Sequence, residues 1–130
     1  MGGKVPPMAL DRRTDSAQLR AMNRPDVFHA HIYFDPTELE QAQALAERVR
    51  VRFGVKVGRF HLGPVGPHPR GSCQLTVPGE VFGDFTTWAA VNRGALTIFG
   101  HAETGNDLID HTSHVVWFGP SEELNLSQFM

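Results

Sequence analysis

The residues from Val27 to Phe34 alternate between apolar and polar side chains. The apolar positions begin at Phe28, and the positions between them carry His29, His31 and Tyr33. Successive side chains of a β-strand point to opposite faces of its sheet. The pattern therefore predicts a strand with one face in the core and a polar face that holds both histidines and the tyrosine.

A helix is predicted directly after this strand. Asp35, Pro36 and Glu38 have the order of an N-cap, a first-turn proline and a capping-box acid. Apolar residues then recur at helical spacing as far as Phe53, and Gly54 stands where a helix commonly ends. We expect about four turns of helix.

The same patterns continue to the end of the chain. Alternation and length predict strands over 55–62, 72–77 and 95–101, a helix over about 82–92, and a short strand over 114–119. Residues 63–71 contain three prolines around His68 and predict a stiff loop. The order is βαββαβ with an added strand, which favours an α+β, ferredoxin-like fold with an antiparallel sheet and helices on one face.

The predicted domain covers residues 27–120. Residues 1–26 show no sustained period and are expected to form a loose arm with one helical turn near 16–22. Residues 121–130 are expected to form a tail that frays.

The predicted topology gathers histidines at one end of the sheet. The strand order is four, one, three, two, and we take strand one to be antiparallel to strand four and parallel to strand three. His29 and His31 then lie beside His101 at the end of strand four, with His61 and His68 at the same edge. A solvated polar strand face is the alternative explanation for each histidine taken alone.

The chemistry of such a cluster suits a metal ion. Nearby carboxylates are Glu103, Asp107 and Asp110, and imidazole with hard oxygen ligands suits iron or zinc. Cys73 is the only cysteine, so neither a thiolate pair nor an internal disulfide is available. Spacing does not separate the two metals.

Composition excludes several classes of protein. The chain has 130 residues, 41% apolar and 20% charged, with a formal net charge of −2, which is typical of one globular domain and disfavours binding to nucleic acid. The first thirty residues contain no long apolar stretch. We expect a cytoplasmic protein without a signal peptide or membrane span.

Four ordered motifs add a more specific indication: 28–34 (FHAHIYF), 63–69 (GPVGPHP), His101 with Thr104-Gly105, and Asp110-His111 followed by 116–119 (VWFG). Together they resemble the DOPA 4,5-dioxygenase family over roughly residues 28–119. Ala102 is a departure, because the family usually has proline after this histidine.

The resemblance implies extradiol cleavage of a catechol such as L-DOPA by dioxygen at a non-haem Fe(II) ion, with zinc as the alternative metal. It implies His29, His31 and His101 as the pool of metal ligands and His68 or His111 as acid–base groups. A carboxylate ligand would come from Glu103 or Asp110. The residues expected to contact substrate are Arg59 and Arg70, as a carboxylate clamp, together with Tyr33 and His61.

The runner-up hypothesis is a non-catalytic, ferredoxin-like dimeric binding module with Trp117 and Phe118 at its interface. A homodimer is expected under either hypothesis. An RNA-recognition domain shares the topology, but the acidic balance and the lack of a basic-aromatic strand pair argue against it.

Overall fold

A computed structural model describes residues 24–130 of the chain. The loose arm predicted over residues 1–26, with its helical turn near 16–22, lies outside the described residues except for its last positions. None of the helices described is long and apolar enough to cross a membrane.

Five strands form one sheet in the order β2-β3-β1-β4-β5, and every neighbouring pair is antiparallel. The strands are β1 (Val27–Phe34), β2 (Lys56–His61), β3 (Gly71–Pro78), β4 (Thr97–Ala102) and β5 (Val115–Phe118). The helices are α2 (Leu39–Phe53), α3 (Gly79–Asn92) and α4 (Asp107–Thr112), with single 3-10 turns η1 (Pro36–Glu38) and η2 (Ser127–Phe129). The α+β, ferredoxin-like prediction is confirmed, and β5 is the added strand beside β4.

The predicted direction of the third strand is wrong. β1 and β3 are antiparallel, so that Val27 faces Pro78 and Phe34 faces Gly71. The connectivity explains the error: a helical crossover makes β1 parallel to β2, and the β2–β3 hairpin then reverses the chain. His61 pairs with Ser72 and therefore lies at the opposite end of the sheet from His29.

The start and end of the first helical segment follow the predicted signals. The backbone N–H of Asp35 donates to Oε1 of Glu38 over 2.8 Å, which forms one half of the capping box. Gly54 closes α2 with a φ of 68°, in the left-handed region where a glycine is favoured.

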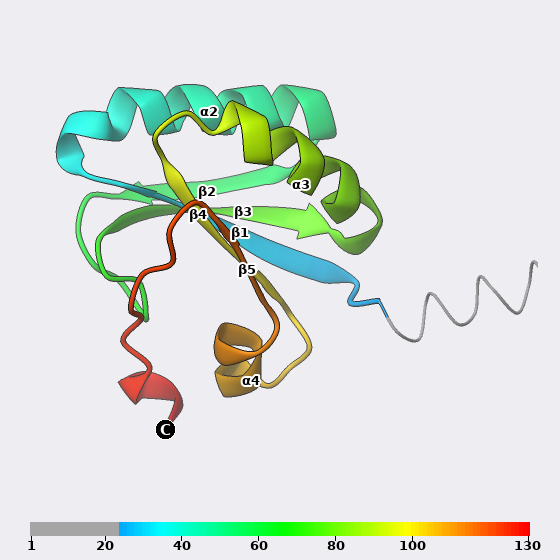
Figure 1. The fold of residues 1–130 in the computed structure, drawn as a ribbon, viewed down its shortest axis with the longest axis vertical. Helices are drawn as coiled ribbons and strands as arrows, with labels where there is room; N and C mark the ends of the chain where they lie inside the picture. Colours follow the sequence, from blue (N-terminus) through cyan, green and yellow to red (C-terminus); the bar gives the residue numbers. More distant parts are fainter. Residues whose placement is uncertain (1–23) are drawn as a thin grey trace, which may run out of the picture.

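Helices α2 and α3 cover one face of the sheet, and the hydrophobic core lies between them and the strands (Figure 1). Phe85 of α3 has no exposed surface. Its ring lies 5.9 Å from that of Phe82, 6.0 Å from that of Phe53 and 5.8 Å from that of Phe118, measured between centroids. One aromatic side chain thus joins both helices to β5.

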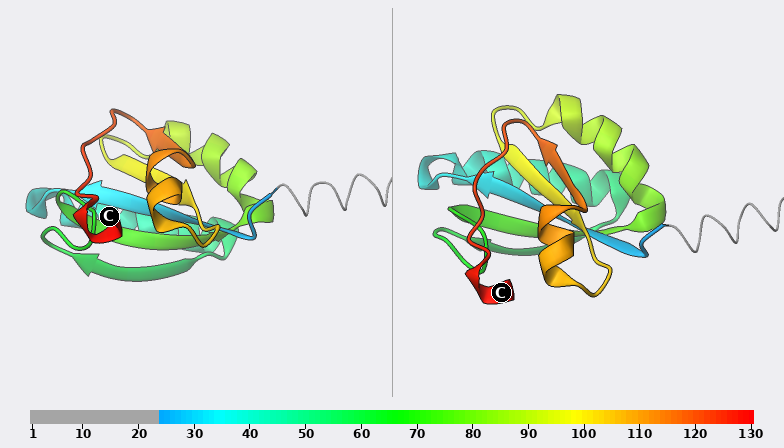
Figure 2. Two further views of the ribbon diagram at one scale, coloured as in Figure 1. Left: turned by 90° about the horizontal axis from the view of Figure 1, so that it is seen from below. Right: turned by 60° about the horizontal axis from the view of Figure 1, so that its bottom comes forward.

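The opposite face of the sheet carries α4 and the C-terminal segment, which we define as residues 121–130 (Figure 2). The prediction that this segment frays is wrong. The backbone N–H of Asn125 donates to the carbonyl of Pro67 over 2.9 Å, and the ring of Phe129 lies 4.6 Å from that of His111. The segment is held against the sheet face by contacts with residues distant in sequence.

Replacing Phe85 by alanine tests the packing of this core. We expect Phe85→Ala to lower the free energy of unfolding by about 3–5 kcal/mol, because it leaves a cavity among three aromatic rings. The matched control is Val91→Ala on the same helix, where the side chain is 82% exposed and the expected change is below about 0.5 kcal/mol. Urea denaturation measures both, and equal effects would contradict the core assignment.

Candidate metal centre

The register of β1 and β4 brings three histidines together on the sheet face opposite α2 and α3. His29 lies directly across from His101, and His31 lies across from Phe99. The Nε2 atoms of His31 and His101 are 3.1 Å apart, and one ligand atom from each of the three histidines lies within 4.8 Å of the others. His31 is 4% exposed and His101 is 1% exposed. We call these three residues the histidine triad.

The tautomer of His101 follows from its backbone contact. Its Nδ1 lies 2.9 Å from the carbonyl oxygen of Ala102, and because a carbonyl only accepts, Nδ1 carries the proton. In the neutral ring, the lone pair is then on Nε2, which faces His31. Such backbone contacts commonly orient a metal-binding histidine.

Glu103 is the carboxylate nearest to the triad among those considered as ligands. Its Oε2 lies 3.5 Å from Nδ1 of His101 and 3.7 Å from Nδ1 of His29. The Glu103 side chain is 35% exposed and that of His29 is 21% exposed, so this side of the triad meets solvent. Asp107, the third candidate, is exposed at the start of α4.

The donor set fits a transition metal ion. Imidazole nitrogens bind zinc at about 2.0–2.1 Å, so two ligands of one ion lie no more than about 4.2 Å apart. The 3.1 Å between His31 and His101 meets this limit. Neutral imidazole with an adjacent carboxylate suits iron and zinc alike.

Burial keeps the imidazoles neutral. Burial, and then the neighbouring His68 and His101, lower the pKa of His31 well below its usual range. Burial is also the largest cause that lowers the pKa of His101 to about 4, against the opposing backbone contact at Ala102. For His29, burial outweighs the carboxylate of Glu103 and lowers the pKa. Neutral rings are the form that binds a metal.

His68 reaches the triad by a different route from the predicted one. The loop that contains His68 leads into the start of β3, which lies beside the end of β1. On its way it folds over the polar face, which is the sheet face opposite α2 and α3. A turn closed by the bond from the His68 N–H to the Val65 carbonyl (3.0 Å), with Gly66 at a φ of 53°, shapes this loop. The His68 ring lies 4.0 Å from that of His31.

Tyr33 holds His68 in place. The hydroxyl of Tyr33 lies 2.7 Å from Nδ1 of His68, and both side chains are buried. Burial, and then the charge of Glu122, raise the pKa of Tyr33 above its usual range, so the hydroxyl keeps its proton. Burial, and then His111, lower the pKa of His68 to about 4.

His111 lies over the other side of the triad. It belongs to α4, and its ring is 4.1 Å from that of His101. Its Nδ1 donates to the carbonyl of Asp107 over 2.7 Å, so that in the neutral ring Nε2 carries a lone pair. The sequence analysis did not predict α4, although the sequence carries a signal for it. That signal is Asn106, whose side chain caps the helix by accepting a hydrogen bond from the Ile109 N–H over 3.0 Å.

Asp110, one of the carboxylates predicted as a candidate ligand, is bonded to neighbouring polar groups. It is fully buried and accepts hydrogen bonds from the backbone N–H of Thr104 (2.7 Å), the Thr104 hydroxyl (2.6 Å) and Nδ1 of His114 (2.8 Å). Burial alone would raise the pKa of Asp110, but these bonds lower it. Asp110 therefore anchors the turn after β4, which explains why Thr104 belongs to the motif.

Ala102, the position where the sequence resemblance led us to expect proline, has a role of its own. It lies in β4, and its backbone N–H donates to the carbonyl of His114 over 3.0 Å. Proline has no N–H and would lack this bond. Alanine at this position therefore allows a hydrogen bond between the end of β4 and the residue that precedes β5.

The predicted substrate contacts lie in different places. Arg70 is bonded to Glu122 and Asp35, so its guanidinium already has anionic partners. Arg59 is exposed on β2, and His61 lies beyond Ser72 at the far end of the polar face. Tyr33 lies between this end and the triad.

Two aromatic residues complete the face. Phe99 on β4 and Trp117 on β5 have ring centroids 4.5 Å apart, and Trp117 lies 6.1 Å from the Tyr33 ring. Alternation along the fourth strand places Phe99 and His101 on one face of the sheet. This pattern was the sequence signal that could have identified Phe99 as a residue of the site. Trp117 had been considered only as a core or interface residue.

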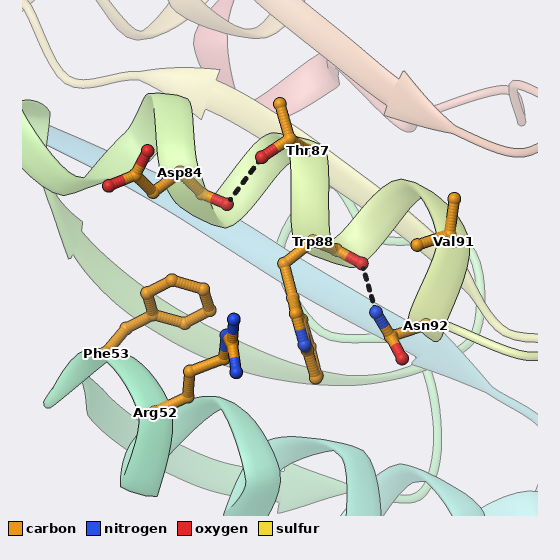
Figure 3. Close-up of a pocket in the computed structure, with 7 residues that line it drawn as sticks. All are labelled: Arg52, Phe53, Asp84, Thr87, Trp88, Val91 and Asn92. Carbon is orange, nitrogen blue, oxygen red and sulfur yellow. Dashed lines mark hydrogen bonds between the residues drawn. The ribbon is translucent and has the colours of Figure 1, made fainter.

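A separate pocket of about 600 Å³ lies between α2 and α3, on the side of the sheet away from the triad (Figure 3). Its lining residues are Arg52, Phe53, Asp84, Thr87, Trp88, Val91 and Asn92. The Asn92 amide donates to the Trp88 carbonyl over 2.8 Å and accepts from Arg48 over 3.1 Å. The pocket is a groove of the helix layer and contains none of the predicted site residues.

A family profile and a curated relative indicate one family for this chain. The profile of the Dopa 4,5-dioxygenase family matches residues 28–128. A curated DOPA 4,5-dioxygenase of Amanita muscaria is 37% identical over 109 residues, which are 77% of this chain and 48% of that protein. An uncharacterized 21.2 kDa protein of Botryotinia fuckeliana is 35% identical over 112 residues, or 77% of this chain and 61% of that protein.

The fold agrees as well. The crystal structure of a candidate dioxygenase of Nostoc punctiforme superposes with a TM-score of 0.76 at 36% identity, and covers 79% of this chain and 90% of that chain. The chain spans about half the length of the Amanita relative.

The buried imidazoles predict a loss of stability in mild acid. Burial lowers the pKa values of His68 and His101 from 6.5 to about 4, so the unfolded chain binds protons first as the pH falls. Between pH 7 and pH 5 we expect the free energy of unfolding of the metal-free protein to fall by on the order of 2 kcal/mol for each of these histidines. Urea denaturation at both pH values measures it; His101→Asn should show a shallower dependence, and an unchanged free energy would contradict the prediction.

Proposed function

The chain belongs to the DOPA 4,5-dioxygenase family, and on that premise we propose that it is a metal-dependent extradiol dioxygenase that opens the ring of a catechol. The observation that carries the proposal is the histidine triad. Three imidazoles kept neutral by burial meet on one sheet face, beside one carboxylate and under two further histidines.

We assign His29, His31 and His101 as the residues that would hold the ion, with Glu103 as the carboxylate. Asp110 is the weaker candidate, because both of its oxygens accept hydrogen bonds from Thr104 and His114. Fe(II) is preferred over zinc, since histidine with carboxylate is the usual ligand set of non-haem iron oxygenases. When bound, Fe(II) would supply open coordination positions for the catechol oxygens and dioxygen together with redox chemistry.

His111 is suited to accept a proton from a catechol hydroxyl. Its Nδ1 proton is donated to the Asp107 carbonyl, so the free Nε2 is the basic atom. The ring lies against His101 on one side and Phe129 on the other, which fixes its plane beside the triad. His111 is therefore our choice for the general base.

His68 is suited to return a proton later in the reaction. Tyr33 retains its hydroxyl proton, and if it donates this proton to Nδ1 of His68, the imidazole carries its own proton on Nε2. A neutral imidazole cannot release this proton alone, because an imidazolate would remain. The Nε2 proton can leave toward the site beside His31 when Nδ1 takes the Tyr33 hydroxyl proton in the same step, and Tyr33 then regains a proton from solvent. We assign His68 as the general acid and Tyr33 as the residue that sets its tautomer.

Aromatic side chains limit the access of water to the polar face. Phe99 has no exposed surface, and Trp117 and Phe129 are partly buried near it and near His111. A site with few competing waters strengthens the electrostatic contacts on which proton transfer depends. The rings of Trp117 and Phe129, which are only partly buried, offer apolar surface to the ring of a catechol.

Oxygen uptake tests the proposed activity directly. The protein reconstituted anaerobically with Fe(II) should consume oxygen and form a coloured ring-fission product with a catechol such as L-DOPA. The same preparation without metal is the control. Absence of turnover across a panel of catechols, in protein shown to hold iron, would favour the binding-module alternative.

Two alanine variants separate ligand from acid. His31→Ala should lose bound metal, because it removes the most central imidazole of the triad, whereas His68→Ala should retain metal and slow turnover by about 10²–10⁴-fold. Metal analysis and oxygen uptake measure the two effects. His61→Ala, at the far end of the face, is the control for metal content, and equal loss of metal in His31→Ala and His68→Ala would make His68 a ligand.

A further inference from the structure

At the far end of the polar face, Arg70 forms an ion pair with Glu122, and more negative than positive charges surround this pair. Nε and Nη2 of Arg70 donate to the two oxygens of Glu122 over 3.0 and 2.7 Å, which is the bidentate geometry. Nη1 donates to Asp35 over 3.1 Å and lies 3.6 Å from Glu38. One guanidinium therefore lies among three carboxylates.

This group of four residues, which we call the Arg70 cluster, adjoins the proposed site. The guanidinium lies over the Tyr33 ring at 5.9 Å from its centroid. The Tyr33 hydroxyl contacts His68, and the His68 ring contacts His31 of the triad. The side chains of Arg70 and Glu122 are 28% and 25% exposed, so molecules in solution have access to the cluster.

The position of Glu122 is set by the fold. The backbone N–H of Asn125 is bonded to the Pro67 carbonyl, and Phe129 packs on His111, so the C-terminal segment is attached on both sides of the polar face. A carboxylate held in this way stays opposite Arg70. It differs from a surface ion pair between two mobile side chains, which contributes little.

The occupied guanidinium changes what this end of the site can recognise. Arg70 has no free bidentate edge for a carboxylate of a substrate, and the excess of negative charge in the cluster disfavours an anion and favours a cation. This differs from the carboxylate clamp that the sequence had suggested for Arg70.

We propose that Glu122 is a specificity-determining residue that masks Arg70, so that the site accepts catechols whose side chain is cationic, zwitterionic or uncharged and discriminates against those whose side chain carries a carboxylate without an ammonium group. The inference rests on the proposed function, because it concerns the substrate class of the same site. Removal of the Glu122 charge frees one edge of Arg70 and weakens this preference.

Three catechols that differ at the end of a short side chain test this inference: dopamine, 4-ethylcatechol and 3-(3,4-dihydroxyphenyl)propanoate. Anaerobic titration calorimetry on the metal-loaded protein measures binding without turnover. The wild-type protein should bind the carboxylate ligand at least about tenfold more weakly than dopamine. Glu122→Gln and Glu122→Ala should reduce this ratio by about tenfold or more, through tighter binding of the carboxylate ligand.

Controls distinguish unmasking of Arg70 from a general loss of negative charge. Glu123→Gln removes the same charge from an exposed neighbour and should leave the ratio unchanged. Adding Arg70→Gln to Glu122→Ala should remove the gain for the carboxylate ligand, and metal content and thermal unfolding show whether each variant is folded. An equal ratio in wild type, Glu122→Gln and Glu122→Ala overturns the assignment of Glu122 alone. If 4-ethylcatechol does not bind the folded, metal-loaded wild type, the proposed function fails and the inference fails with it.

Discussion

The pairing of β1 with β4 is the constraint on which the candidate site depends. It places His29 opposite His101 and brings the Nε2 atoms of His31 and His101 to 3.1 Å. A shift of one residue in this register would turn the histidines toward the core and the apolar side chains toward the polar face. The register is therefore enforced by the hydrophobic core under α2 and α3, and the site takes its geometry from the same burial that stabilises the fold.

Alternation along the strands was enough to predict which residues share the polar face, because the period of two is a local property of the backbone. Alternation did not predict the direction of β3. That direction depends on how the connections between strands turn the chain, and no residue pattern within the strand indicates it. The error displaced His61 to the wrong end of the face. His68 still contacts the triad, because a proline-rich loop folds across the sheet. No local sequence pattern predicts the path of this loop or the contact between His68 and His31.

The remaining differences arise from contacts between distant parts of the chain. Residues 121–130 have the composition of a fraying tail, yet Glu122 is bonded to Arg70, which is 52 positions away in sequence. Asp110 was expected as a candidate carboxylate ligand, but the fold directs it to Thr104 and His114 instead. In both cases the residue type indicated a polar interaction correctly, and only the fold determined the partner.

The two ends of the polar face differ in the charge of their side chains: one holds neutral, buried imidazoles and the other holds partly exposed charged groups. Around the triad, burial lowers the pKa values of the imidazoles and keeps them neutral, so a divalent cation can enter without displacing protons. At the Arg70 cluster, permanent charges remain partly exposed and determine which charged groups can approach. In the proposed site, metal binding would depend on β1 and β4, which lie inside the sheet, whereas recognition of a substrate side chain would depend on a loop and the C-terminal segment. Under this proposal, substitutions in residues 121–130 would alter the substrate class while the metal centre and the core stay unchanged.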